Sequence, residues 1–205
     1  MSKFYDDKYS AEEYYWGRQP SSIARILFQK FPPHNDQKLL DVGCGEGRDS
    51  VFFARSGYHV TGFDSSAEGV KKSLAWADEL KLSIDFFPAD INEYRLQESY
   101  DVIFASGALH YIPPPLREEI LSNYKRFTTS GGIHAFTVPI SKPFLPKDPQ
   151  ADHLEHNWRS GEILTHYHDW KIEFFTEEIL DDNRSGYKWT VNRLIAREPS
   201  GLSLA

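Results

Sequence analysis

Two alternating patterns of apolar residues constrain what this chain can fold into. Short runs typical of β-strands occupy residues 38–43, 58–64, 83–90, 100–107 and 131–140. Helical patterns cover about residues 20–30, 46–56, 66–80 and 115–129. Strands that alternate with helices of about ten to fifteen residues indicate a parallel sheet covered on both faces. The sequence therefore predicts an α/β fold, with a three-layer, doubly wound sheet.

The end of the chain follows a different pattern. Residues 169–178 and 187–198 predict two strands, and the DDNRSG link between them is too short for the crossover that a parallel pair needs. We therefore expect the sheet to finish in an antiparallel hairpin. Residues 140–160 are proline-rich and irregular, and such a stretch is more often a functional cover than a connector. A short helix is expected at 160–167.

Composition narrows the partners and the compartment. The 205 residues suit one domain, and a net charge of −7 without a Lys/Arg run disfavours a nucleic-acid partner. The single cysteine, Cys44, excludes an internal disulfide and fits a reducing compartment. No stretch approaches about 18 apolar residues, and the start MSKFYDDK lacks the apolar part of an export signal. We expect a cytoplasmic protein without a membrane partner, as a monomer or homodimer.

A glycine turn follows the first predicted strand, in the stretch LLDVGCGEGRDS at residues 39–50. The strand ends at Asp41–Val42, and the turn Gly43–Gly47 leads into a helix. Glycines let a ligand approach the backbone, and a helix N-terminus offers N–H groups, at the sheet edge where doubly wound folds bind ligands. Arg48 stands where a dinucleotide fingerprint has its third glycine. A nicotinamide-dependent oxidoreductase is therefore the less favoured alternative.

Polar residues close the next strands as well. Asp64 ends the second predicted strand, Asp90 the third and Ser106 the fourth. Asp64 is placed to accept hydrogen bonds from two ribose hydroxyls, and Asp90 to face an adenine amino group. Either acid alone is as readily a helix cap or a turn residue. Together, after this glycine turn, they favour a nucleoside-containing cofactor.

These motifs resemble those of a known class of enzymes. LLDVGCGEGR, VTGFD, PADI and YDVIFASGALHYI look like the class I S-adenosylmethionine-dependent methyltransferases. Within that class, FYDDKY, GRDSVFFARSGYHVTGFD, the Gly161-Glu162 to Trp170 pattern and the closing LIAR are most similar to the tellurite-resistance (TehB-like) methyltransferases. The resemblance covers nearly the whole chain, and residues 140–158 depart from it. It implies a Rossmann-like, seven-stranded, mostly parallel sheet of order 3-2-1-4-5-7-6, with the last strand antiparallel.

The resemblance also implies a cofactor and a division of the chain. S-adenosyl-L-methionine would be bound, and a small molecule would accept the methyl group. The single methyltransferase domain would comprise an N-terminal arm and helix (1–36), a cofactor-binding core (37–140), an acceptor-side cover (141–168) and C-terminal strands (169–205). The expected cofactor-binding residues are Tyr15, Arg18, Asp41, Gly43, Cys44, Gly45, Gly47, Arg48, Asp64, Ser65, Asp90, Ile91 and Ser106. Cys44 is expected to fill space in the loop rather than act as a nucleophile.

The N-terminal segment FYDDKYSAEEYYWGR is unusually rich in rings for a chain end. Ring faces attract cations, and a sulfonium is a cation, so we expect a folded cover over the cofactor. The rings concerned are Tyr5, Tyr9, Tyr14, Tyr15 and Trp16. Arg18 would be available for the cofactor carboxylate or an acidic acceptor. Packing of the rings onto the sheet is the alternative, and both can hold for different rings.

The acceptor is expected just past the fourth strand, near the candidate catalytic residue His110. This imidazole is a candidate general base or acceptor-orienting donor, with a helix-entry residue as the alternative. A soft sulfur, selenium or tellurium nucleophile needs no strong base. An oxygen or nitrogen acceptor, or a cofactor-binding regulator without turnover, are the other hypotheses. The histidines of 152–168 predict a polar cover rather than a metal site, since no zinc motif accompanies them.

Overall fold

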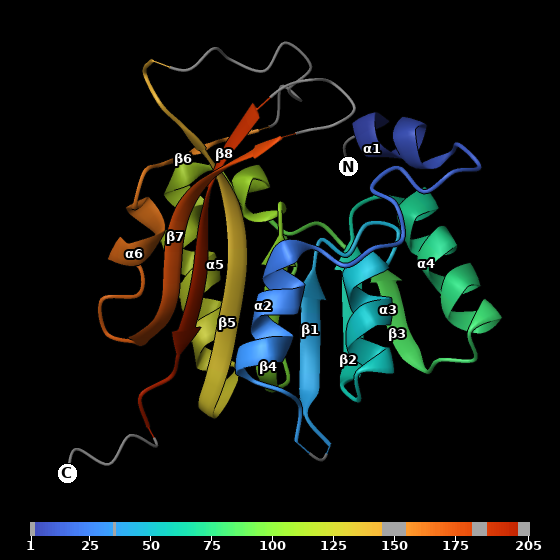
Figure 1. Cartoon of the computed structure of the whole chain (residues 1–205), viewed down its shortest axis with the longest axis horizontal. Helices are drawn as coiled ribbons and strands as arrows, with labels where there is room; N and C mark the ends of the chain where they lie inside the picture. Colours follow the sequence, from blue (N-terminus) through green and yellow to red (C-terminus); the bar gives the residue numbers. More distant parts are fainter. Residues whose placement is uncertain (1–2, 35, 145–154, 182–187, 201–205) are drawn as a thin grey trace.

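One mixed sheet crosses the molecule, with helices on both of its faces (Figure 1). The structure, a computed structural model, describes residues 3–34, 36–144, 155–181 and 188–200. The strands are β1 (Lys38–Val42), β2 (His59–Asp64), β3 (Ile84–Pro88), β4 (Tyr100–Ser106), β5 (Thr128–Ser141), β6 (Trp158–Arg159), β7 (Lys171–Asp181) and β8 (Lys188–Arg197). The predicted α/β fold is confirmed.

The strand order is β3-β2-β1-β4-β5-β8-β7, with β1 to β5 parallel and β8 antiparallel to both of its neighbours. This is the expected order when the two-residue β6 is left out. The sequence did not predict β6, which pairs Ile140 with Trp158 inside the stretch expected to be irregular. Because β6 returns to β5, it fixes one end of the cover segment to the sheet.

The helices divide between the two faces of the sheet. They are α1 (Lys3–Tyr9), α2 (Ser22–Lys30), α3 (Arg48–Arg55), α4 (Ala67–Glu79), α5 (Arg117–Arg126) and α6 (Glu162–Thr165), with 3-10 turns η1 (Leu109–Tyr111) and η2 (Pro114–Leu116). One core cluster joins α2, α3 and α4 to the sheet, and a second joins α5 and α6 to its other face. In Figure 1, α2 and α3 lie in front of the sheet and α5 behind it.

The helix boundaries follow local chemistry, with three differences from expectation. Ser21 and Ser66 cap α2 and α4, where their hydroxyls accept the backbone N–H groups three residues ahead. The helix predicted at 115–129 ends at Arg126, because Thr128 already pairs with β4. The helix predicted at 46–56 is shorter, because Gly47 is the N-cap and Ser56 the C-cap of α3. The N-terminal arm contains the helix α1, which the sequence did not predict.

His134 on β5 is fully buried and takes part in a hydrogen-bonded cluster behind the sheet. Its Nδ1 lies 2.6 Å from the Tyr167 hydroxyl, and its Nε2 lies 2.7 Å from Thr128 Oγ1. Burial, and next the charge of Lys125, lower the pKa of His134 well below its ordinary value of 6.5. The imidazole is therefore neutral in the folded protein under conditions in which the unfolded chain binds a proton.

Acid should destabilise the protein through His134. Because the folded-state pKa is depressed, the stability is present above about pH 6.5 and is lost as pH falls from there toward the folded pKa. Between pH 7.5 and 5.0 this group should remove about 2 kcal/mol from the free energy of unfolding. Urea unfolding of the wild type and of His134→Gln at both pH values measures it, and the variant should lose less. The exposed His59 supplies the control, His59→Gln, and equal losses in all three proteins would contradict the assignment.

Candidate active site

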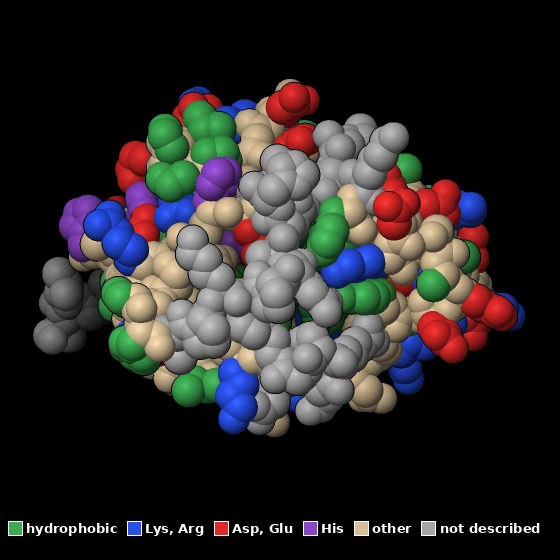
Figure 2. Space-filling view, turned by 90° about the horizontal axis from the view of Figure 1, so that it is seen from above, with side chains coloured by type: hydrophobic (Ala, Val, Ile, Leu, Met, Phe, Trp, Pro, Cys, Tyr) green, Lys and Arg blue, Asp and Glu red, His purple; other side chains and the backbone are tan. Residues whose placement is uncertain are grey.

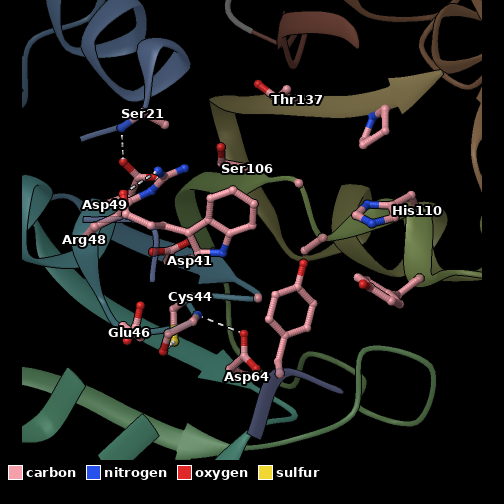
Figure 3. Close-up of a pocket in the computed structure, with 18 of the residues that line it drawn as sticks. Ser21, Asp41, Cys44, Glu46, Arg48, Asp49, Asp64, Ser106, His110 and Thr137 are labelled. Atoms are coloured by element: carbon pink, nitrogen blue, oxygen red, sulfur yellow. Dashed lines mark hydrogen bonds and ion pairs between the residues drawn. The ribbon is translucent and has the colours of Figure 1, made fainter. Parts of the chain in front are cut away.

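A cavity of about 540 Å³ opens at the carboxyl ends of the parallel strands. Its floor is the glycine turn after β1, and residues at the ends of β2 and β4 and inside β5 form its walls. The N-terminal arm and the η1 turn close two further sides. In Figure 3, His110 lies across the cavity from Arg48 and Asp49. This is the edge of a doubly wound sheet at which ligands bind.

The glycine turn needs glycine for two separate reasons. Gly43 and Gly45 have φ values of 70° and 56°, in the left-handed region that side chains disfavour. A Cβ on Gly43 would lie 2.4 Å from Ala108 Cβ, and one on Gly45 would lie 2.9 Å from the Tyr9 hydroxyl. The turn therefore packs tightly against η1 on one side and against the N-terminal arm on the other.

Asp64, at the end of β2, is bonded to the glycine turn. One oxygen of its carboxylate accepts the Gly45 N–H at 2.8 Å, and the other accepts the Ser66 N–H at 2.8 Å (Figure 3). Burial raises the pKa of Asp64 above its usual value, and these backbone N–H groups act in the opposite direction. The carboxylate is thereby fixed in orientation beside the backbone of the loop.

Two more carboxylates lie behind the turn. Asp41 is 2% exposed and accepts the Ser50 hydroxyl at 2.5 Å. Burial, followed by the negative charge of Asp49, raises the pKa of Asp41 to about 8. Asp49 accepts the Ser21 N–H at 2.6 Å, and burial raises its pKa as well. This wall of the cavity favours a positively charged group, because a nearby cation stabilises the ionised carboxylates.

Most of the residues expected at the site line this one cavity. They are Asp41, Gly43, Cys44, Gly45, Arg48, Asp64, Ser65, Ser106 and His110. They come from the ends of three strands and the turns after them, as the topology of a parallel sheet requires. Cys44 is buried and reduced, and burial raises the pKa of its thiol well above the usual value.

Five expected residues do not line the cavity: Tyr15, Arg18, Gly47, Asp90 and Ile91. Arg18 pairs with Glu79 at 3.3 Å and stacks over the Tyr14 ring, and its contact with the cofactor or an acidic acceptor stays a prediction. Gly47 starts α3, and Tyr15 donates its backbone N–H to Glu46 at 2.7 Å. The sequence could not reveal these contacts, because they join the arm to distant parts of the chain.

The two expected adenine residues, in the segment after β3, do not line the cavity. The Asp90 carboxylate accepts the Asn92 N–H at 2.8 Å, the turn role that was its alternative interpretation. Ile91 is buried in the core cluster next to α5. The backbone just before them still runs along Asp64, whose carbonyl accepts the Ala89 N–H at 3.0 Å.

Some rings of the aromatic arm face the cavity, and others pack against the protein. Tyr5, Tyr9 and Trp16 line the cavity, as a cover would. Tyr14 instead packs edge-on against Trp76 of α4, with a centroid distance of 5.1 Å. Tyr15 packs between Tyr9 and Trp16. The arm thus presents some rings to the site and uses the others to attach itself.

Several lining residues were missed by sequence reasoning. They are Ser21, Ser22, Glu46, Asp49, Thr137, Pro139, Leu180, Trp189 and Val191, among others. Thr137 lies inside β5 and pairs in register with Ser106, so it reaches the cavity level with the end of β4. The residues of the hairpin β7–β8 carried no signal, because no sequence motif marks where a hairpin passes over the sheet edge.

The described part of the expected cover includes residues 155–168. Glu155 and His156 lie beside η1, where the His156 N–H donates to the His110 carbonyl at 2.6 Å. His166 pairs with Glu118 at 2.8 Å, and Figure 2 shows histidine side chains gathered on the α6 side of the molecule. The predicted residues Asp152 and His153 lie outside the described residues. Within the described ranges, no three or more His, Cys, Asp or Glu side chains form a metal-binding group.

The chain was compared with known proteins. A family model described as tellurite resistance protein TehB matches residues 4–193. A probable S-adenosyl-L-methionine-dependent methyltransferase TehB of Haemophilus influenzae is 27% identical over 170 residues, covering 78% of this chain and 57% of that protein. A ubiquinone biosynthesis O-methyltransferase of Actinobacillus pleuropneumoniae is 34% identical over 108 residues, covering 50% and 45%. The chain thus spans about half the length of these curated relatives.

The fold comparison agrees. The crystal structure of TehB from Haemophilus influenzae superimposes with a TM-score of 0.78 at 22% identity, covering 96% of this chain and 66% of that one. At this identity the likeness concerns the fold alone. No helix among the described residues has both the length and the apolar character needed to cross a bilayer.

The packing of Gly43 against Ala108 can be tested by a double-mutant cycle. Gly43→Ala should cost more than 2 kcal/mol of unfolding free energy, because it combines a left-handed backbone with a steric clash. Gly131→Ala isolates the backbone part, since Gly131 has a φ of 71° and nothing within 4 Å of its added Cβ. Adding Ala108→Gly to Gly43→Ala should remove the clash and reduce the cost in unfolding free energy to that of Gly131→Ala. Equal costs for both single variants would contradict the clash.

Proposed function

We propose a methyl-transfer function from the premise that this chain belongs to the TehB family of tellurite resistance proteins. The chain is an S-adenosyl-L-methionine-dependent methyltransferase that acts on a small molecule. The observation that carries the proposal is the hydrogen bond between the Gly45 N–H and Asp64 inside a cavity whose wall also contains Asp41. A glycine cradle next to buried carboxylates fits a ligand with an amino-acid end, a ribose and a positive charge.

Each part of the cofactor has residues suited to hold it. We assign the ammonium to the wall formed by Asp41, and the ribose hydroxyls to the remaining lone pairs of Asp64. Ser106 and the glycine turn would hold the amino-acid end. Asp90 and Ile91 remain the proposed adenine contacts; they follow β3, beside Asp64. When bound, the cofactor supplies an electrophilic methyl group, and the residues of this chain orient it and exclude water.

The favoured acceptor is a soft sulfur, selenium or tellurium nucleophile. The family membership supports it, and so does the cavity wall of Tyr5, Tyr9 and Trp16, whose ring faces suit a sulfonium and a polarisable acceptor. An oxygen acceptor is the second candidate. The similarity to an O-methyltransferase over half of this chain is the observation that favours it.

Cofactor binding should depend on Asp64. Titration calorimetry of the wild type should give heat with S-adenosylmethionine and S-adenosylhomocysteine, and none with NAD⁺. Asp64→Ala should weaken both affinities about 10- to 100-fold, because it removes charged hydrogen bonds to the ribose. Asp85→Asn, on the exposed face of the neighbouring β3, is the control and should bind like the wild type. Absence of heat with both nucleosides would overturn the proposed function, and heat with NAD⁺ would favour the oxidoreductase.

The covering role of the arm is tested by separating its two kinds of ring. Trp16→Ala should weaken S-adenosylmethionine binding about tenfold and leave the melting temperature nearly unchanged, because Trp16 lines the cavity yet is 38% exposed. Tyr14→Ala should lower the melting temperature instead, since its ring packs on Trp76. Deletion of residues 1–17 should reduce both affinity and turnover. Unchanged affinity in the deletion protein, with the fold intact, would show that the arm is no cover.

A further inference from the structure

A histidine and a glutamate face each other at the acceptor end of the cavity. His110 lies on η1, is 3% exposed and lines the cavity. Its Nε2 lies 4.0 Å from Oε1 of Glu155, whose side chain is 6% exposed. At this distance the two groups attract each other by charge when the imidazole is protonated, and a small approach would complete a hydrogen bond. Because Nε2 faces the carboxylate, a neutral imidazole that keeps its hydrogen on Nε2 has its lone pair on Nδ1.

The backbone next to Glu155 is held by contacts of His156 with two different elements. The His156 N–H donates to the His110 carbonyl at 2.6 Å, so the two residues are joined through the backbone as well. Arg117 of α5 donates to the His156 carbonyl and pairs with Glu162 at 2.7 Å. The segment beside Glu155 is thus bonded to both η1 and α5.

Trp158 adds a second attachment to the same turn. Its indole N–H donates to the Leu109 carbonyl at 3.2 Å, and its ring lies 4.1 Å from the Arg117 guanidinium. Both Trp158 and Arg117 are fully buried. Such a buried guanidinium with several carbonyl and carboxylate partners is a rigid support. It supports the backbone that follows Glu155.

Both side chains of the pair are nearly inaccessible to solvent and lie among tyrosine rings. The Tyr111 ring lies 4.3 Å from the His110 ring, centroid to centroid. Burial raises the pKa of Tyr5 above its usual value, its hydrogen bond with Tyr111 opposes this, and the charge of Glu155 adds to it. Among the described residues, Glu155, Tyr111 and Tyr5 are titratable groups close to this pair. A buried carboxylate is stable there when it faces a group that can become a cation.

We propose that Glu155 is a positioning residue that orients His110 as the general base for an acceptor whose nucleophilic atom carries a proton. The inference rests on the proposed methyl-transfer function and specifies its substrate class. A thiol, selenol or hydroxyl has such a proton, whereas tellurite and selenite attack through a lone pair without losing one. A buried carboxylate behind the imidazole has a catalytic use only for the first group.

In the proposed step, His110 takes the proton of the acceptor while the methyl group is transferred. The acceptor X–H gives its proton to Nδ1 of His110 while X forms a bond to the methyl carbon. The bond from that carbon to sulfur breaks, and its electron pair stays on sulfur as the neutral thioether of S-adenosylhomocysteine. The positive charge lost by the sulfonium appears on the imidazolium, which Glu155 stabilises at Nε2. The imidazolium then releases its proton to water, and no oxidant or reductant is required.

The experiment compares two thiols that differ in whether they need a base. 2-Mercaptoethanol is protonated at pH 7, whereas 4-nitrothiophenol is already an anion. Glu155→Gln and His110→Gln should lower kcat for the first thiol at least tenfold and leave kcat for the second within about twofold. The KM for S-adenosylmethionine should stay unchanged in both variants. Glu118→Gln, which removes the carboxylate of the exposed His166 pair, is the matched control and should behave like the wild type.

Equal losses with both thiols, loss with neither, or a wild type that methylates only 4-nitrothiophenol would overturn the proposal. A second measurement needs no acceptor at all. NMR titration of histidine-labelled protein with S-adenosylhomocysteine bound should show the His110 titration moving about one pH unit lower in Glu155→Gln, with the signal assigned from its absence in His110→Gln. An unchanged titration would also overturn the proposal. Failure of the wild type to bind the nucleoside would instead overturn the proposed function.

Discussion

The hydrogen bond from the Gly45 N–H to Asp64 joins the two loops on which the site depends. Because β1 and β2 are parallel and adjacent, the loops after them begin at the same edge of the sheet. Asp64 spans the gap between the loops by accepting from Gly45 and from Ser66, the N-cap of α4. The backbone of the turn therefore has its N–H groups and carbonyls in set directions before any ligand arrives, which reduces the ordering that binding requires.

The N-terminal arm depends on this floor and could not pack without it. The Tyr9 ring lies where side chains on Gly45 or Gly69 would be, so two glycines distant in sequence form one recess for it. Asp6 accepts the Ser66 hydroxyl at 2.6 Å, which places a negative charge at the N-terminus of α4. Lys72 holds the arm through the carbonyls of residues 11 and 13. Because these hydrogen bonds can break one at a time, the arm can open locally without unfolding of the sheet, as a cover over a ligand must.

The sequence predicted the parts of the molecule that follow from strand periodicity and from the ends of strands. Asp41, Asp64 and Ser106 meet in one cavity because parallel strands deliver their carboxyl ends to one edge. The partner of Arg18 could not be predicted, since nothing local indicates that Glu79, 61 residues further along the chain, pairs with it. For the same reason, Glu155 was predicted only as part of the polar cover: its proximity to His110 comes from β6 and Arg117 rather than from any motif.

The buried carboxylates also explain which charge the cavity can accept. Glu46 has Lys72 at 2.5 Å, so its charge is matched within the protein. Asp41 accepts the neutral hydroxyl of Ser50, and its raised pKa means that it retains a proton over part of the neutral range. A cation brought against Asp41 takes the place of that proton, whereas a neutral or anionic group gains nothing from the same contact. The wall behind the glycine turn therefore selects the positive end of a ligand, which leaves the opposite wall, where His110 lies, for the acceptor.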